Sequence, residues 1–223
     1  MKIILDRYKM ISDLCRGKKV LDVGCVGHDL NFRRNSVWIH KLLHECAASV
    51  TGLDYDAKNV SQLIREGYTA VCADATDFEL GQTFDVVVAG ELIEHLANPA
   101  GFLACAKKHL SPDGLLVLTT PNAQGLMYCL QNLILGHELE NPDHVCFYTP
   151  RTLACLFRKC GLEMVNAVYI AGMRPQGHDR LFFYCMALLK NIIKFPFYLL
   201  RPSLCHRFLA VARPVKNDYR HQL

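Results

Sequence analysis

The sequence predicts an α/β fold in which a largely parallel sheet lies between two layers of helices. Two near-continuous apolar runs, at 86–89 and 115–118, suit strands that are covered on both faces. Apolar residues recur at helical spacing between such runs, so strand and helix alternate along the chain, as in α/β proteins. The 223 residues, 51% of them hydrophobic, can bury the core of one domain.

The expected elements follow in a simple order. Residues 1–16 mix charged and apolar residues at helical spacing, which predicts an amphipathic helix packed on the sheet and no signal peptide. Further helices are expected at 35–46, 57–65, 99–109 and 149–160. Strands are expected to end at 23 and 54 and to occupy 68–75, 84–89, 114–120, 163–170 and 208–212. The whole of 1–223 reads as a single domain, with an apolar, basic insertion at about 174–206 between the last two strands.

Acidic residues and glycines follow the first two strands. Asp22, Gly24 and Gly27 lie at the end of the first strand, and Asp54 closes the second. Open α/β sheets bind ligands beyond the carboxyl ends of their strands, where glycine lets the backbone approach and an acid can accept ribose hydroxyls. A dinucleotide would need a G-x-G-x-x-G turn for its pyrophosphate, which the charge of Asp22 would repel. The pattern therefore indicates a nucleoside cofactor of another kind.

These residues resemble motif I of the class I S-adenosylmethionine (SAM) methyltransferases, D-x-G-x-G-x-G. Val26 and His28 stand where that motif has its second and third glycines, with Gly27 displaced between them, so the path of this loop stays open. The third strand ends in Asp74, and residues 84–95 match the family's F-D-x-V-x-x-x-x-x-x-E-H form. With the strand 114–120 and its Pro-Asn end, these elements make the chain similar to the small-molecule, ubiquinone-synthesis-like members of the superfamily.

The resemblance implies a Rossmann-like seven-stranded sheet in the order 3-2-1-4-5-7-6, with strand 7 antiparallel and helices on both faces. It implies SAM as cofactor, with the ribose on Asp54 or on Asp56, and the adenine near Asp74. Glu91 has two interpretations, since it would either orient the cofactor's amino group or stabilise the start of a helix through the dipole. The expected cofactor-binding residues are Asp22, Gly24, Cys25, Gly27, Asp54, Tyr55, Asp74, Ala75, Gly90 and Glu91.

Two histidines are candidates for a catalytic base. Methyl transfer from a sulfonium is an in-line displacement, and positioning can supply most of its acceleration. A base is needed only where the acceptor must lose a proton, and histidine suits a hydroxyl acceptor. His95 follows the fourth strand, and His144 lies in a segment that resembles the family's substrate-side H-x-x-x-[FY]-[ST] loop. Structural roles, anchoring a helix or holding the loop, stay open for both.

No metal site is predicted. The eleven cysteines contain no C-x-x-C pair and no histidine at zinc spacing, and no carboxylate cluster resembles the magnesium site of catechol-type methyltransferases. Because the cysteines are scattered through expected strands and helices without a signal sequence, reduced thiols in a cytoplasmic protein are expected.

The acceptor is expected to be a small molecule or a glycan-linked or lipid-linked one, giving an O-methyl product. Methylation of nucleic acid is disfavoured, because 89–92 is not the Asn/Asp-Pro-Pro-aromatic run of amino methylation and no Pro-Cys pair exists. Carbon or nitrogen methylation, and a SAM-fold binding module without turnover, stay open. Residues 174–223 carry nine Lys or Arg and two Asp. The apolar, basic stretch 181–207 therefore suits a peripheral membrane contact, or else a lid or dimer contact.

Overall fold

The computed structural model of the protein describes residues 1–27, 37–135, 141–171 and 194–216. The strands are β1 (Lys2–Ile4), β2 (Lys19–Val23), β3 (Ser49–Asp54), β4 (Ala70–Cys72), β5 (Phe84–Gly90), β6 (Leu110–Pro121), β7 (Leu162–Ile170) and β8 (Arg207–Pro214). The helices are α1 (Arg7–Cys15), α3 (Ile39–Cys46), α4 (Ala57–Arg65), α5 (Pro99–Lys108), α6 (Leu126–Leu135) and α7 (Pro150–Lys159), with 3₁₀ turns η1 (Ile93–His95) and η2 (Pro202–Leu204).

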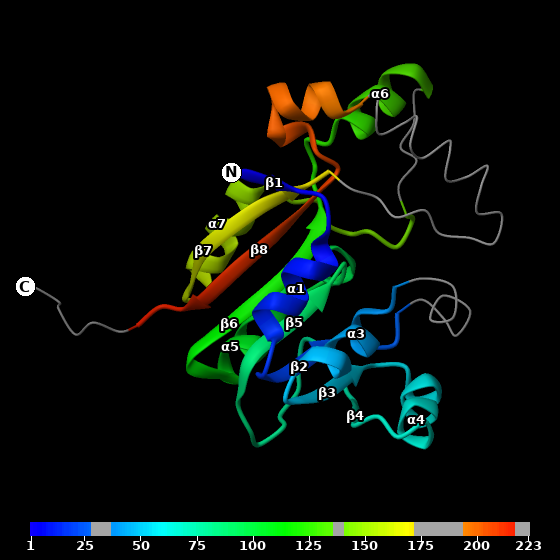
Figure 1. Ribbon diagram of the computed structural model, residues 1–223, viewed down its shortest axis with the longest axis vertical. Coiled ribbons are helices and arrows are strands. Elements are labelled where there is room, and N and C mark those ends of the chain that lie inside the picture. Colours follow the sequence, from blue (N-terminus) through cyan, green and yellow to red (C-terminus); the bar gives the residue numbers. More distant parts are fainter. Residues whose placement is uncertain (28–36, 136–140, 172–193, 217–223) are drawn as a thin grey trace, which may run out of the picture.

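All eight strands form one sheet in the order β1-β7-β8-β6-β5-β2-β3-β4 (Figure 1). Neighbouring strands are parallel except at β8, which runs antiparallel to both β6 and β7. If β2 is counted as the first strand, the seven strands β2 to β8 stand in the order 3-2-1-4-5-7-6 from β4 onward. The predicted topology, with its antiparallel seventh strand, is therefore confirmed.

Helices cover both faces of the sheet, as expected. Val86 and Val88 of β5 pack on one face, in a core shared with α1 and α3. Val87 and Ala89 pack on the opposite face, in a core shared with α5 and α7. Successive residues of a strand point to opposite faces, so the apolar run at 86–89 feeds both cores at once.

The prediction for the amino terminus was partly wrong. Instead of one helix over 1–16, β1 pairs in parallel with the edge of β7 and adds an eighth strand. The helix α1 begins only after Asp6, whose side chain accepts hydrogen bonds from the backbone N–H groups of Tyr8 and Lys9. Ile3 and Ile4 pack against different cores, an alternation too short to be distinguished from helical spacing in the sequence.

Two further segments differ from expectation. The helix expected at 35–46 begins only at Ile39, because the backbone of Trp38, the residue before it, is extended; residues 28–36 lie outside the described part. The helix start that one interpretation of Glu91 required after β5 is only the turn η1. Of the insertion at 174–206, residues 174–193 lie outside the described part and 194–200 are helical. Figure 1 shows that helical stretch (orange) at the same end of the molecule as α6. None of the described helices is long and apolar enough to cross a membrane.

Candidate active site

A cavity of about 1020 Å³ opens at the carboxyl ends of the parallel strands. The carboxyl ends of parallel strands meet at one edge of a sheet, so residues far apart in the sequence gather there. Every residue that the sequence singled out lines this cavity: Asp22, Gly24, Cys25, Gly27, Asp54, Tyr55, Asp74, Ala75, Gly90, Glu91, His95 and His144.

The loop after β2 turns over the end of the sheet. Gly24 (φ 79°) and Gly27 (φ 72°) have left-handed backbone, which glycine adopts at no steric cost. The indole N–H of Trp38 donates to the carbonyl of Cys25 at 2.7 Å and fixes the middle of the loop. Val26, which replaces a motif glycine, is buried in a small core beneath α4 and does not line the cavity. The valine therefore leaves the cavity open.

Asp54 is held rigidly at the end of β3. Its Oδ2 accepts from the backbone N–H of Val26 at 3.0 Å, and its Oδ1 accepts from that of Asp56 at 3.1 Å. Burial raises the pKa of Asp54, although these hydrogen bonds oppose the rise. Asp56 instead caps α4, with its side chain accepting from the N–H of Asn59 at 3.0 Å. Both acids considered for a ribose line the cavity, but both oxygens of Asp56 accept from Asn59 at the start of α4, whereas Asp54 is held by backbone N–H groups alone. Tyr55, between them, is 84% exposed.

Asp74 and Ala75 lie beyond β4 at one end of the cavity. One oxygen of Asp74 accepts from the N–H and the hydroxyl of Thr76, at 2.7 and 2.8 Å, and these bonds lower the pKa of Asp74. The other oxygen has no hydrogen bond within the described residues and is available to an amino group.

Glu91 pairs with two arginines, a contact that neither interpretation of this residue included. Its Oε1 lies 3.0 Å from Nη1 of Arg7, and its Oε2 lies 2.6 Å from Nε of Arg207. Burial alone would raise its pKa, but Arg207 and Arg7 hold the pKa of Glu91 below its ordinary value. With φ 52° it is the only residue other than glycine with a positive φ in the described chain. The helix-start role is wrong, because no α-helix follows, and contact with the cofactor's amino group stays a prediction.

Glu94, His95 and His144 meet at another part of the cavity wall. One side-chain oxygen or nitrogen atom of each lies within 4.8 Å of the others, and the centroids of the imidazole rings are 4.6 Å apart. The Nδ1 of His95 donates to the carbonyl of Asp143 at 3.2 Å, which orients the ring. These three atoms could also bind a divalent cation. The ligand spacings considered in the sequence did not include this combination.

Burial sets the charges in this cluster. It raises the pKa of Glu94 to about 8, with a further contribution from the charge of Glu91. The hydroxyl of Thr120 donates to Oε2 of Glu94 at 3.0 Å, while its Oε1 has no partner among the described residues. Burial, followed by the neighbouring His95, lowers the pKa of His144. Near neutral pH the cluster therefore holds a neutral imidazole that can accept a proton, beside a largely protonated carboxyl group.

Several residues that line the cavity were missed in the sequence: Arg7, His40, Glu94, His206 and Arg207. Glu94 stood in the E-H pair of the strand-four motif and could have been found there. The others have no local signal, because they come to the cavity from α1, from α3, and from β8 with the residue before it. His206 contacts the hydroxyl of Tyr128 through Nε2 at 3.1 Å, and burial together with Arg207 lowers its pKa to about 4.

The residues fit a nucleoside cofactor with a cationic end. The cavity has the volume of a small-molecule site. Asp54 is fixed in place for hydroxyl donors, and Asp74 keeps one carboxylate oxygen available. Asp22 is buried at the cavity wall, and its Oδ1 has no hydrogen-bond partner among the described residues. Its Oδ2 already accepts from Nδ1 of His40 at 2.9 Å, so Oδ1 is the atom left for a cationic or donor group of a ligand.

Known proteins agree with this interpretation. Residues 4–167 match the family described as Methyltransferase domain. The ubiquinone biosynthesis O-methyltransferase of Burkholderia pseudomallei (strain 1710b) is 28% identical over 162 residues, which cover 70% of this chain and 68% of that protein. That of Cereibacter sphaeroides (strain ATCC 17025 / ATH 2.4.3) is 31% identical over 165 residues, 68% of this chain and 62% of that protein. The human mitochondrial protein is 29% identical over 169 residues, 68% of this chain and 43% of that protein.

Solved structures share the fold. A SAM-dependent methyltransferase from Archaeoglobus fulgidus aligns with a TM-score of 0.61 at 18% identity, over 92% of this chain and 90% of that one. The CcbJ methyltransferase from Streptomyces caelestis aligns with a TM-score of 0.59 at 15% identity, over 93% and 88%. By its family match, its fold and the acids that line its cavity, the chain belongs to the methyltransferase domain family and is a class I SAM-dependent methyltransferase.

Proposed function

We propose that this enzyme transfers the methyl group of SAM to a hydroxyl oxygen of a small acceptor, giving an O-methyl product. The observation that carries the proposal is the cluster of Glu94, His95 and His144 beside the cofactor crevice. A neutral nitrogen acceptor can attack through its lone pair without first losing a proton, but a hydroxyl must lose its proton, and a nearby imidazole is a suitable acceptor for it. The relatives named above are themselves called O-methyltransferases.

The chain's own residues would bind and orient the cofactor. SAM supplies a methyl group on a positively charged sulfur, which is activated without help from the protein. Asp54 would accept hydrogen bonds from the ribose hydroxyls, and Asp74 from the adenine amino group. Asp22 would accept one from the cationic amino group of the methionine end. Arg7 offers a guanidinium for the carboxylate at that end. These contacts would hold the methyl in line with the acceptor oxygen, and alignment supplies most of the acceleration.

His144 is the first choice for the residue that takes the acceptor's proton. Its pKa is lowered by burial, so the ring is neutral and can accept a proton near neutral pH. His95 lies against it with its Nδ1 committed to the carbonyl of Asp143, which leaves Nε2 to face the acceptor. Glu94 would share the proton with these rings once it is ionised.

An apolar or lipid-linked acceptor suits the end of the molecule around α6. Leu133 (81%) and Ile134 (75%) of α6 are exposed, as are Leu199 (64%) and Leu200 (77%) of the helical stretch 194–200. Arg201 directly follows Leu200, and Lys194 begins the same helical stretch. We therefore propose that this end rests on an anionic membrane surface while the acceptor enters. For the acceptor, the alternative is a glycan-linked molecule. For this apolar end, the alternative is a lid or a dimer contact.

Calorimetric titration with SAM and S-adenosylhomocysteine tests the cofactor part. We expect micromolar binding that is lost in Asp54→Ala and kept in Asp56→Asn, because asparagine caps a helix as well as aspartate does. Absence of binding by folded wild-type protein would contradict the proposal.

Release of S-adenosylhomocysteine in the presence of a catechol with a short prenyl chain tests the acceptor part. We expect turnover, with a large fall in His144→Asn. The analogue of this catechol with both hydroxyls O-methylated has no proton to lose and should give no turnover. Cofactor binding without turnover on hydroxyl acceptors would favour a binding module, and turnover on the ether would favour carbon methylation. Sedimentation with vesicles containing phosphatidylserine tests the membrane contact, which Leu199→Ser with Leu200→Ser should weaken.

A further inference from the structure

The segment Trp38-Ile39-His40, at the start of α3, contacts the cofactor crevice at three separate points. Trp38 donates to the carbonyl of Cys25, as described above. Ile39 fills the space above Gly90, where a β-carbon would lie 2.6 Å from its Cδ1. His40 contacts Asp22. These contacts come from a helix start rather than from the glycine loop itself, in a chain whose loop lacks two of the motif glycines.

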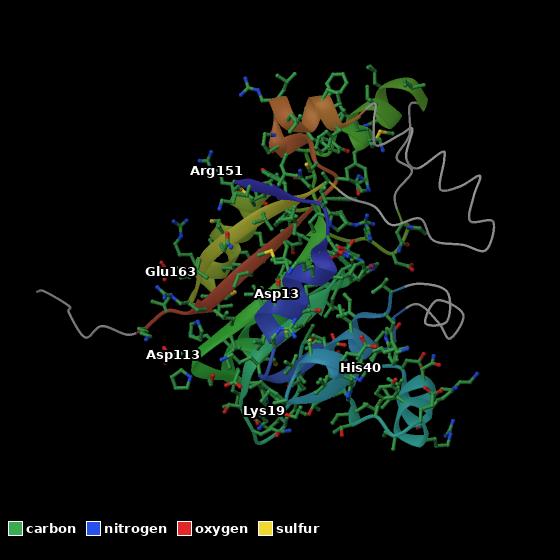
Figure 2. The ribbon with its side chains drawn as sticks, viewed as in Figure 1. Asp13, Lys19, His40, Asp113, Arg151 and Glu163 are labelled. Atoms are coloured by element: carbon green, nitrogen blue, oxygen red, sulfur yellow. The ribbon has the colours of Figure 1, made fainter. Side chains whose placement is uncertain are left out.

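The contact between His40 and Asp22 is short and fully enclosed. Nδ1 of His40 lies 2.9 Å from Oδ2 of Asp22, and the two side chains are 0% and 4% exposed. Because a carboxylate oxygen can only accept, Nδ1 carries the hydrogen and donates it. His40, labelled near α3 in Figure 2, is buried and reaches Asp22 of β2 and the position of Gly52 of β3. The contact fixes one oxygen of Asp22 and leaves Oδ1, which has no partner in the described chain, for a ligand in the cavity.

His40 is a costly residue for a merely structural position. Its second ring nitrogen, Nε2, is buried and has no hydrogen-bond partner among the described residues. Burying a polar group without a partner costs free energy, so an apolar side chain of similar size would fill the space at lower cost. The glycine at position 52 also leaves room for the ring. Any other residue there would place its β-carbon 2.9 Å from Cε1 of His40 and 2.7 Å from Sγ of Cys25.

We propose that His40 is a positioning residue for the cofactor, which holds Asp22 so that its second oxygen faces the amino group of the methionine end. The imidazole fixes the carboxylate by a bond to Oδ2, and Trp38 fixes the adjoining loop. Together they take over a function that the motif glycines serve through the backbone. The inference rests on use of SAM alone and is independent of the acceptor proposed above, so the two can fail separately.

The test separates the methionine end from the adenosine end. Binding of S-adenosylhomocysteine and of 5′-methylthioadenosine, which lacks the amino acid group, is measured by calorimetry on the full chain. In His40→Leu we expect the affinity for S-adenosylhomocysteine to fall about 10- to 100-fold, the worth of a hydrogen bond to a charged group. The affinity for 5′-methylthioadenosine should stay within about twofold of the wild-type value.

Two further variants act as controls. His40→Asn places an amide N–H near the position of Nδ1 and should recover most of the lost affinity. His44→Leu, on the same helix with its ring centroid 4.8 Å from that of His40, has no contact with Asp22 and should bind both ligands as wild type does. If His40→Leu does not fold, His40→Gln takes its place. The amide of glutamine lies one methylene farther from the backbone than that of asparagine, so it does not reproduce the bond from Nδ1 to Asp22.

Three results would overturn the inference: an equal loss for both ligands, which indicates a structural role, no loss for either ligand, or failure of His40→Asn to recover binding. Absence of S-adenosylhomocysteine binding by the wild-type protein would overturn it together with the proposed cofactor contacts, whereas absence of acceptor turnover would leave it standing.

Discussion

At the scale of single residues, Glu94 is a group whose charge changes with pH in the working range. Its pKa of about 8 in the folded protein lies well above 4.5, the ordinary value. Between these values the folded chain keeps a proton that the unfolded chain releases, so the free energy of unfolding falls as pH rises through this window. Glu94→Gln cannot ionise and should lose most of that fall. Urea unfolding midpoints measured between about pH 5 and pH 8, in EDTA, check this.

The matched control is Glu45→Gln, an exposed glutamate on α3, which should keep the wild-type dependence on pH. If Glu94→Gln and wild type lose stability equally between those pH values, then Glu94 is not protonated in the folded protein.

The same cluster predicts a response to divalent cations. Glu94, His95 and His144 offer a carboxylate and two imidazole nitrogens at one point, and three such ligands with open positions are typical of catalytic metal sites. A cation held there would acidify the acceptor's hydroxyl in place of the imidazole base, so the two roles exclude each other. If the cluster works in this second way, added Mg²⁺ or Zn²⁺ raises the rate of methyl transfer and EDTA lowers it, with the response lost in Glu94→Gln. A rate that is equal in EDTA and in either metal would mean that the imidazoles act alone.

At the scale of elements, β1 (Lys2–Ile4) and α6 (Leu126–Leu135) are features that the sequence did not predict, and the packing of β1 can be tested. Ile4 packs in the core with α1, whereas Leu5, the next residue, is 66% exposed. Ile4→Ala should therefore lower the free energy of unfolding by about 1–3 kcal/mol, and Leu5→Ala by less than about 0.5 kcal/mol. Urea unfolding of the two variants checks this. Equal, small effects would show that β1 does not pack on β7 in solution.

The other elements show which features are readable in a sequence. The strands β2, β3, β5 and β6 are buried on both faces, so their apolar runs stand out and their carboxyl ends mark the cavity. Glu91 forms ion pairs with Arg7 and Arg207, which are 84 and 116 residues away from it in the sequence. No local pattern predicts such a contact, because it depends on the order of the strands and on the left-handed backbone of Glu91.

At the scale of the whole molecule, the cavity joins the two ends of the chain. Arg7 comes from the first helix, Glu91 from the centre of the sheet and Arg207 from the last strand. The two side-chain contacts are partly buried, with 17% to 29% of each side chain exposed. Glu91→Gln leaves two guanidinium groups without their carboxylate, so we expect it to lower the free energy of unfolding by about 1–3 kcal/mol. Arg213→Gln, whose ion pair with Glu163 is exposed, should cost less than about 1 kcal/mol.

Because the cavity is lined by residues from α1, the sheet and β8, a bound ligand should stabilise the molecule as a unit rather than one loop. A ligand present at about 100 times its dissociation constant adds about 2.7 kcal/mol to the free energy of unfolding. We therefore expect S-adenosylhomocysteine to raise the melting temperature and to slow hydrogen exchange in both α1 and β8. Asp54→Ala should show neither effect. Protection confined to the loop after β2, with α1 and β8 unchanged, would mean that the Arg7–Glu91–Arg207 contacts do not respond to the cofactor, and that the two ends of the chain are joined by packing of the sheet alone.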